Sequence, residues 1–189
     1  MSEPPKLIIL DRDGVINHDS NAYIKSLNEW EPYVESIHAI ARLSKAGWMV
    51  AVATNQSGIA RGYYSEHTLA EMNRELHRQV NQAGGKIDCI AYCPHGPDDD
   101  CDCRKPLPGL LYRIQSALKL ETIAGCWMVG DSLRDLEAGA AVGSRLALVR
   151  TGKGSRTELH GVGLERTLIF DDLAAFTDWL LREERCRPC

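Results

Sequence analysis

The sequence predicts an α/β fold, a doubly wound, Rossmann-like parallel sheet formed by a single domain over residues 1–189. Short apolar runs alternate along the chain with longer segments in which apolar residues recur every three or four positions. This alternation is typical of a parallel sheet covered by helices on both faces. Three of the apolar runs end in polar residues, and a doubly wound sheet collects its functional residues where its strands end.

The strands are predicted from the apolar runs. The first run follows Lys6, and the second, from Trp48 to Ala53, is almost continuously apolar, which is typical of a parallel strand buried on both faces. A third and weaker run ends at Tyr92. In chain order, the six predicted strands cover residues 6–10, 48–53, 87–92, 126–129, 145–149 and 167–170.

The helices are predicted from helical periodicity and from the residues that begin or end them. A basic turn and Gly47 end the first helix, Ser65 is an N-cap for the second, and Pro108 begins the third. The predicted helices cover residues 34–46, 66–83, 108–120, 133–142 and 172–181. The connections after the first and second strands hold one helix each, so we expect no large cap domain.

The composition excludes several functional classes. The chain has 44% hydrophobic and 25% charged residues, as ordinary globular domains do, and its net charge of −4 argues against nucleic-acid binding. Its apolar runs are too short to cross a membrane, and residues 1–6 lack the features of a secretion signal. We therefore expect a cytoplasmic protein, monomeric and without membrane contact. Because disulfides are rare in the cytosol, the seven cysteines need another role.

Carboxylates and neutral hydrogen-bond donors follow the predicted strands. Asp11 and Asp13 come directly after the first run, on the same side of the chain, and Gly14 lets the chain turn away. Two close carboxylates repel each other and attract a hard cation such as Mg²⁺, and one can act as nucleophile and the other as general acid/base. An isolated Asp-x-Asp is more typical of a turn. Two further strand ends, Thr54-Asn55-Gln56 and Gly130-Asp131-Ser132, favour an active site instead.

These residue types suit phosphoryl transfer. Thr54 and Asn55 offer neutral donors to phosphate oxygens, and Gly58 and Gly62 are expected to let the next loop approach a ligand closely. A phosphate monoester together with Asp11 and Asp131 brings about −4 charges to one place. Mg²⁺ and Lys105 would supply about +3 and offset most of the repulsion.

The ordered segments Asp11-Arg-Asp13-Gly-Val, Val52-Ala-Thr54-Asn55-Gln, Lys105 and Gly130-Asp131-Ser-Leu-Arg-Asp135 resemble the four motifs of the haloacid-dehalogenase-like (HAD) phosphatases. The resemblance implies Asp11 as the nucleophile that forms an aspartyl-phosphate and Asp13 as the general acid/base. It implies that Thr54, Asn55 and Lys105 hold the phosphoryl group. Mg²⁺ would be bound by Asp11, the Asp13 carbonyl and Asp131, with Asp135 either a further ligand or a residue that supports the ligands.

A second metal site is predicted between the third strand and the third helix. Cys93, His95, Cys101 and Cys103 form a Cys₃His set, the composition of a closed structural zinc site. The acidic run 98–100 and two prolines mark this stretch as an exposed loop rather than core. The zinc would stiffen the loop that carries Arg104 and Lys105. Cys89 and Cys126 are expected in the core. For Cys186 and Cys189, three interpretations stay open, namely metal binding, redox activity and a disordered chain end.

Within the HAD phosphatases, the segment Thr54–Gly62 and the zinc loop are similar to the D-glycero-D-manno-heptose 1,7-bisphosphate 7-phosphatases. The resemblance implies removal of the 7-phosphate, in carbohydrate metabolism and lipopolysaccharide biosynthesis, with the anomer left open. Arg104 would bind the second phosphate, since guanidinium binds phosphate bidentately, and Arg61 either joins it or is a surface residue without a role. The candidate residues for binding the sugar phosphate are Asp19, Thr54, Asn55, Gln56, Arg61, Arg104 and Lys105.

Two alternatives stay open. Histidinol-phosphate phosphatases share the zinc loop but resemble the chain less after Gln56. Phospho-accepting receiver domains also combine an acidic cluster, Mg²⁺, a Ser or Thr and a Lys, but they lack an acid two residues beyond the phosphorylated Asp. Ser132 stands where many heptose phosphatases have Lys, so any role of that Lys is absent here.

Overall fold

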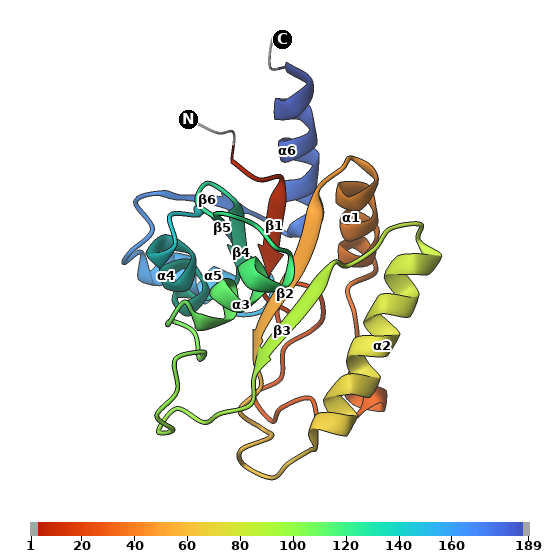
Figure 1. Ribbon diagram of the computed structural model, residues 1–189, viewed down its shortest axis with the longest axis vertical. Coiled ribbons are helices and arrows are strands. Elements are labelled where there is room, and N and C mark those ends of the chain that lie inside the picture. Colours follow the sequence, from red (N-terminus) through yellow and green to blue (C-terminus); the bar gives the residue numbers. More distant parts are fainter. Residues whose placement is uncertain (1–3, 187–189) are drawn as a thin grey trace.

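A six-stranded parallel sheet forms the centre of the computed structural model, which describes residues 4–186 (Figure 1). The strands lie in the order β3-β2-β1-β4-β5-β6, so the chain winds outward from β1 to one edge and from β4 to the other. The predicted doubly wound α/β fold is confirmed. The strands are β1 (Leu7–Leu10), β2 (Met49–Asn55), β3 (Cys89–Cys93), β4 (Trp127–Gly130), β5 (Arg145–Val149) and β6 (Thr167–Phe170).

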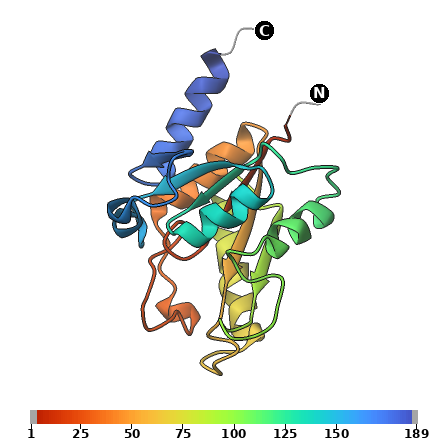
Figure 2. The ribbon, with the colours of Figure 1, turned by 90° about the vertical axis from the view of Figure 1, so that its left-hand side faces the viewer.

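The order of the strands decides where a ligand can bind. Strands β1 and β4 are hydrogen-bonded neighbours in the sheet, although β2 and β3 lie between them in the chain. The connections diverge at this point and leave a crevice beyond the carboxyl ends of the strands. Figure 2 shows the connecting loops gathered at this end of the sheet, while α6 (Leu173–Cys186) projects from the other.

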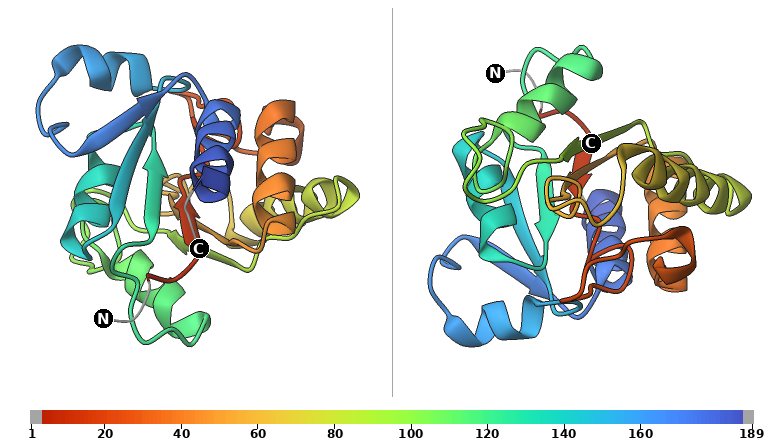
Figure 3. Two further views of the ribbon diagram at one scale, coloured as in Figure 1. Left: turned by 90° about the horizontal axis from the view of Figure 1, so that it is seen from above. Right: turned by 90° about the horizontal axis from the view of Figure 1, so that it is seen from below.

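Helices cover both faces of the sheet (Figure 3). Ile8 and Leu10 of β1 face a core built with α1 (Val34–Lys45), α2 (Glu66–Gln82) and α6. Leu7 and Ile9 face a second core built with α3 (Gly109–Ala117) and α4 (Leu133–Ala141). All four β1 side chains are fully buried, which explains why this strand appears in the sequence as an uninterrupted apolar run.

The structure differs from the prediction at several boundaries. Strand β2 includes Thr54 and Asn55, so these residues end the strand instead of following it. Helix α3 stops at Ala117, before Lys119 in the left-handed region (φ 54°). Helix α6 continues to Cys186, which is exposed, whereas Cys189 lies outside the described residues. A 3₁₀ helix at Leu27–Glu29 and helix α5 (Gly154–His160) were not predicted, because neither presents an apolar stripe.

In the part of the chain from 4 to 186, no separate domain covers the strand ends. The β1–α1 connection holds only the 3₁₀ helix, and the β2–β3 connection holds only α2. Within the same residues no helix has both the length and the apolar character to cross a membrane. Because no separate domain covers the strand ends in these residues, the pocket described below is bordered by loops.

Candidate active site

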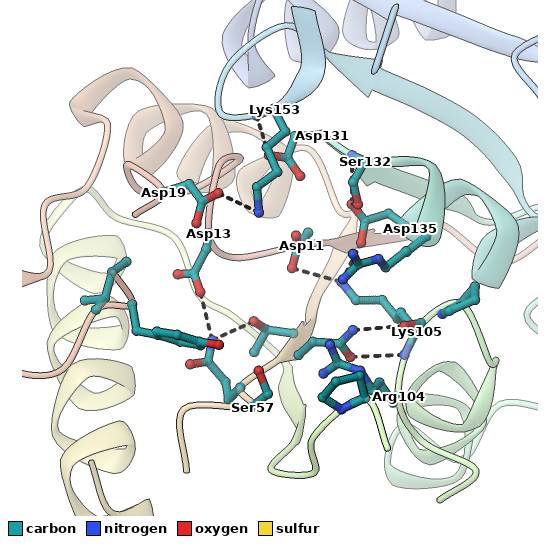
Figure 4. Close-up of a pocket in the computed structure, with 18 of the residues that line it drawn as sticks. Asp11, Asp13, Asp19, Ser57, Arg104, Lys105, Asp131, Ser132, Asp135 and Lys153 are labelled. Atoms are coloured by element: carbon teal, nitrogen blue, oxygen red, sulfur yellow. Dashed lines mark hydrogen bonds and ion pairs between the residues drawn. The ribbon is translucent and has the colours of Figure 1, made fainter. Parts of the chain in front are cut away.

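A pocket of about 660 Å³ lies at the carboxyl ends of the strands (Figure 4). It opens where Asp11 follows β1 and Asp131 follows β4, the position expected from the strand order. The structure brings together at this pocket the following residues singled out from the sequence: Asp11, Asp13, Asp19, Thr54, Asn55, Gln56, Arg61, Cys101, Arg104, Lys105, Asp131 and Asp135.

Asp11 is held at the centre of the pocket. Its backbone N–H donates to Val129 of β4, and its Oδ1 accepts from the Arg12 backbone N–H at 2.8 Å and from Lys105 Nζ at 2.9 Å. Burial and the neighbouring Asp135 carboxylate raise the pKa of Asp11 well above its usual value, although Lys105 acts in the opposite direction. A buried carboxylate in this environment is stabilised by additional positive charge.

Lys105 has all three of its ammonium N–H groups engaged within the protein. Nζ lies 2.9 Å from Asp11, 2.7 Å from Asp135 Oδ1 and 2.6 Å from the Ala53 carbonyl. Burial would lower the pKa of Lys105, but Asp11 and Asp135 raise it above its usual value. The ammonium is therefore charged and balances two carboxylates, so a direct contact with phosphate requires it to exchange one of these partners.

Three carboxylates form a cluster that suits a hard cation. Oxygens of Asp11, Asp131 and Asp135 all lie within 4.8 Å of one another. Burial and Asp135 raise the pKa of Asp131 to about 7, as expected for like charges without a cation between them. Asp135 also caps α4, since its Oδ2 accepts from the backbone N–H and hydroxyl of Ser132 at 3.1 and 2.8 Å. The position of Asp135 is thus compatible with both expected roles, as a ligand of the cation and as a residue that supports the ligands.

Asp13 is turned away from this cluster and is held by donors. Its Oδ1 accepts from Arg12 Nε and from Asn17 Nδ2, both at 2.9 Å, and its Oδ2 accepts from Gln56 Nε2 at 2.9 Å. Burial would raise the pKa of Asp13, but the Arg12 guanidinium and these hydrogen bonds lower it below its usual value. The Asp13 side chain is 22% exposed and therefore faces the pocket.

Two predicted phosphate-binding residues have other partners in the structure. Asn55 holds the backbone of Lys105, because its Nδ2 donates to the Lys105 carbonyl and its Oδ1 accepts from the Lys105 N–H, both at 3.0 Å. Gln56, expected to contact the substrate, donates instead to Asp13 and, at 2.8 Å, to Thr54 Oγ1. Because the Thr54 hydroxyl accepts from Gln56, its own proton is available to a ligand.

Gly58 has a packing role that was not predicted. A Cβ at Gly58 would lie 2.3 Å from Cε1 of Tyr64 and 3.2 Å from Cδ1 of Tyr23. The glycine therefore makes room for these aromatic rings. Gly62 has φ 73°, which favours glycine, and a Cβ there would meet nothing within 4 Å.

Charged residues from separate loops form the rim of the pocket. Lys153 Nζ pairs with Asp19 at 2.9 Å, and the Arg104 guanidinium donates to the His95 carbonyl at 3.2 Å. Arg61 is exposed and lies over the Tyr23 ring at 5.9 Å. Lys153 was not predicted, because its loop has no motif and only the position of β5 in the sheet would have placed it here.

The predicted zinc ligands come together beside the pocket. Zinc bonds of about 2.3 Å to sulfur and about 2.0 Å to nitrogen place tetrahedral ligands about 3.8 Å apart for two sulfurs and about 3.5 Å apart for sulfur and nitrogen. Cys93 Sγ lies 3.9 Å from Cys101 Sγ, and His95 Nδ1 lies 3.5 Å from Cys93 Sγ and 3.4 Å from Cys103 Sγ. These three distances, together with the approach of all four ligand atoms to within 4.8 Å of one another, fit a tetrahedral zinc ion.

Comparisons with known proteins agree with this geometry. A HAD-hydrolase-like family model matches residues 102–176. The D-glycero-β-D-manno-heptose-1,7-bisphosphate 7-phosphatases of Pseudomonas putida and Pseudomonas aeruginosa are 60% and 58% identical to the chain, in alignments that cover 93% of it and 99% and 98% of the relatives.

A solved structure gives the same result. The crystal structure of the D,D-heptose 1,7-bisphosphate phosphatase from B. bronchiseptica, in complex with magnesium and phosphate, has a TM-score of 0.89 and 50% sequence identity, and the match covers 94% of this chain and 98% of that one. A receiver domain is excluded by this relationship. The chain belongs to the D-glycero-β-D-manno-heptose-1,7-bisphosphate 7-phosphatase family of HAD hydrolases.

Proposed function

We propose that the protein is a Mg²⁺-dependent phosphatase that removes the 7-phosphate from D-glycero-β-D-manno-heptose 1,7-bisphosphate. The observation that carries the proposal is the convergence of Asp11, Asp13, Thr54 and a three-carboxylate cluster in one pocket. The names of relatives at 51–60% identity support the substrate and its β anomer. They favour the heptose over the histidinol-phosphate alternative.

The reaction follows from the partners of the two aspartates. Oδ1 of Asp11 is held by Lys105 and the Arg12 N–H, so Oδ2 attacks phosphorus and the bond to the C7 oxygen breaks. The negative charge of the bound phosphate opposes the donors that lower the pKa of free Asp13, so Asp13 takes up a proton together with the substrate and gives it to the departing sugar oxygen. Asp13 then takes a proton from the water that cleaves the aspartyl-phosphate, which releases phosphate. The Thr54 hydroxyl donates to a phosphoryl oxygen, and Lys105 balances the charge of Asp11.

Mg²⁺ would be held by Asp11, Asp131 and the backbone carbonyl of Asp13, and it would offset the negative charge that otherwise keeps phosphate away from Asp11. The raised pKa values of Asp11 and Asp131 support this assignment, because both groups lack sufficient positive charge nearby. Asp135 would complete the carboxylate cluster or orient Lys105.

We propose that the Cys93, His95, Cys101 and Cys103 side chains bind a structural zinc ion. All four tetrahedral positions are then filled by protein, so no position is left for a reacting water. The ion would fix the loop that ends in Arg104 and Lys105. Arg104 and Arg61 are proposed to bind the 1-phosphate, and Asp19 to accept a hydrogen bond from a sugar hydroxyl.

We further propose that residues 1–189 act as one domain, as a monomer in the cytoplasm. The proposed reaction uses no residue of a second copy, because Asp11, Asp13, Thr54 and Asp131 of one chain line the same pocket. Light scattering at micromolar concentration tests it, and a stable dimer would contradict it.

A comparison of substrates tests the function. We expect kcat/KM to be highest for the β anomer of the heptose bisphosphate, and activity to be lost with EDTA and restored by Mg²⁺. The comparison includes the α anomer, histidinol phosphate and fructose 1,6-bisphosphate. A preference of tenfold or more for histidinol phosphate, about 1.4 kcal/mol, would make the alternative function correct.

A further inference from the structure

Gln56 is buried beside the proposed acid/base, and its side-chain amide is fully engaged. It is 3% exposed, and its two amide N–H groups donate to Asp13 Oδ2 at 2.9 Å and to Thr54 Oγ1 at 2.8 Å. Its Oε1 accepts a short hydrogen bond from the Tyr64 hydroxyl. Since an amide nitrogen has two protons, none is left to donate to a substrate.

Chemistry fixes the orientation of this amide. In the flipped orientation, Oε1 would face the Asp13 carboxylate, and two acceptors would repel each other. The observed orientation instead needs a donor at Oε1, which is the Tyr64 hydroxyl. Burial raises the pKa of Tyr64 to about 12, so the phenol keeps its proton over the whole working range of pH.

The loop after β2 places Tyr64 for this contact. Tyr64 is 9% exposed, and its ring occupies the space that a side chain at position 58 would fill. The Tyr63 N–H donates to the Gly58 carbonyl at 2.9 Å and folds the loop back toward Gln56. Figure 4 shows the hydrogen bond between Gln56 and Asp13 as a dashed line from the Asp13 carboxylate.

We propose that Gln56 is a positioning residue for Asp13 and that Tyr64 acts through Gln56, by holding its amide in the orientation that donates to Asp13. Arg12 and Asn17 fix one oxygen of the Asp13 carboxylate, and Gln56 fixes the other. The carboxyl group is thereby held in one plane. This inference rests on the proposed phosphatase function, because it concerns how the acid/base is aimed at the leaving oxygen.

The test compares Gln56→Met, which keeps length and removes both polar atoms, with Tyr64→Phe, which removes only the hydroxyl. Two substrates are used: the heptose bisphosphate, whose alkoxide must receive a proton, and p-nitrophenyl phosphate, whose phenolate leaves without one. For the sugar substrate we expect Gln56→Met to lower kcat/KM by about 100-fold. Tyr64→Phe should lower it by about fivefold, as expected for one lost hydrogen bond. KM for the sugar should stay within about twofold, and kcat/KM for p-nitrophenyl phosphate should fall much less.

The double variant and a neighbouring tyrosine provide the controls. In the Gln56→Met background, Tyr64→Phe should have no further effect, because Tyr64 would have no amide to orient. Tyr63→Phe removes the hydroxyl of the adjacent, exposed tyrosine and should leave both activities unchanged. Thermal unfolding of each variant shows whether it is folded, and the Tyr64→Phe comparison stands by itself if Gln56→Met is not.

Several results would overturn the proposal. Equal losses on both substrates with a raised KM would assign Gln56 to phosphate binding. Unchanged kcat/KM for the sugar in both variants would leave Gln56 without a positioning role, and an additive Tyr64→Phe effect in the double variant would show that Tyr64 acts independently. Absence of phosphatase activity in the unmodified protein is a separate result, because it contradicts the proposed function itself.

Discussion

Asp11 is the residue on which the proposed chemistry depends most directly. Asp11→Asn keeps the shape of the side chain but removes the charge and the nucleophilic oxygen, so phosphate release should fall to background. The melting temperature should stay the same or rise, because the buried carboxylate has a raised pKa and its charge is costly in the fold. Phosphate release and thermal unfolding measure the two effects. Asp13→Asn should lose most turnover as well, whereas near-normal hydrolysis by Asp11→Asn would show that Asp11 is not the nucleophile.

The pKa of Asp131 predicts how metal binding depends on pH. It is raised from 3.8 to about 7, so the free energy of unfolding without divalent metal should fall as pH rises from about 4 to about 7. Mg²⁺ held by Asp131, as proposed, would favour the ionised carboxylate and remove this loss. The rise in melting temperature on adding Mg²⁺ should therefore be larger at about pH 8 than at about pH 6. A rise of equal size at both pH values, or one unchanged in Asp131→Asn, would contradict the assignment.

The residues predicted from the sequence are those that carry distinctive chemistry at strand ends. Asp11, Thr54 and Asp131 were placed correctly because parallel strands bring their carboxyl ends to one edge. The partners of these residues could not be predicted. Whether Asn55 holds Lys105 or a phosphate, and whether Lys153 reaches Asp19, depends on how separate loops meet in space, and no spacing in the sequence records that.

At the scale of elements, prediction worked where one side of a segment is buried. Helices α1 and α2 bury apolar residues at helical spacing, and their ends carry a glycine and a serine cap. Helix α5 has seven residues, of which only Gly154 is buried, so its sequence has no periodic signal. The zinc loop shows the opposite case, in which a loop without periodicity was predicted from its ligands alone.

We expect the loop with the four proposed zinc ligands to support the residues that follow it in the chain. Cys103 directly precedes Arg104, and the Arg104 side chain is bonded to the carbonyl of His95. Cys101→Ser should therefore lose zinc, lower the melting temperature and weaken activity together. In the unmodified protein, elemental analysis after removal of Mg²⁺ should give close to one zinc per chain. Cys186→Ser, at an exposed cysteine far from the cluster, serves as the control and should keep its zinc. A fully active, zinc-free protein would contradict a structural role.

At the scale of the whole molecule, no cap covers the pocket within residues 4–186, so we expect the rim to decide specificity. Among the described residues, the pocket mouth is formed by the loops after β1, β2, β3, β4 and β5. The proposed catalytic aspartates follow directly after β1. Three arginines that also line the pocket, Arg61, Arg104 and Arg134, lie on loops or near the start of a helix. We therefore expect the site to accept simple phosphate esters and the rim to favour a substrate with a second charge.

Arg104→Ala tests whether the rim recognises the distal phosphate. A bidentate arginine–phosphate contact contributes about 1.5–3 kcal/mol, so kcat/KM for the heptose bisphosphate should fall by about tenfold to about 100-fold. The value for p-nitrophenyl phosphate, which has no second phosphate, should change little, because Lys105 keeps its contacts with Asp11 and Asp135. Arg104→Lys keeps the charge without the planar fork and should give an intermediate loss. Equal losses on both substrates would mean that Arg104 supports the catalytic centre, and the distal phosphate would then have to be recognised by another residue of the rim.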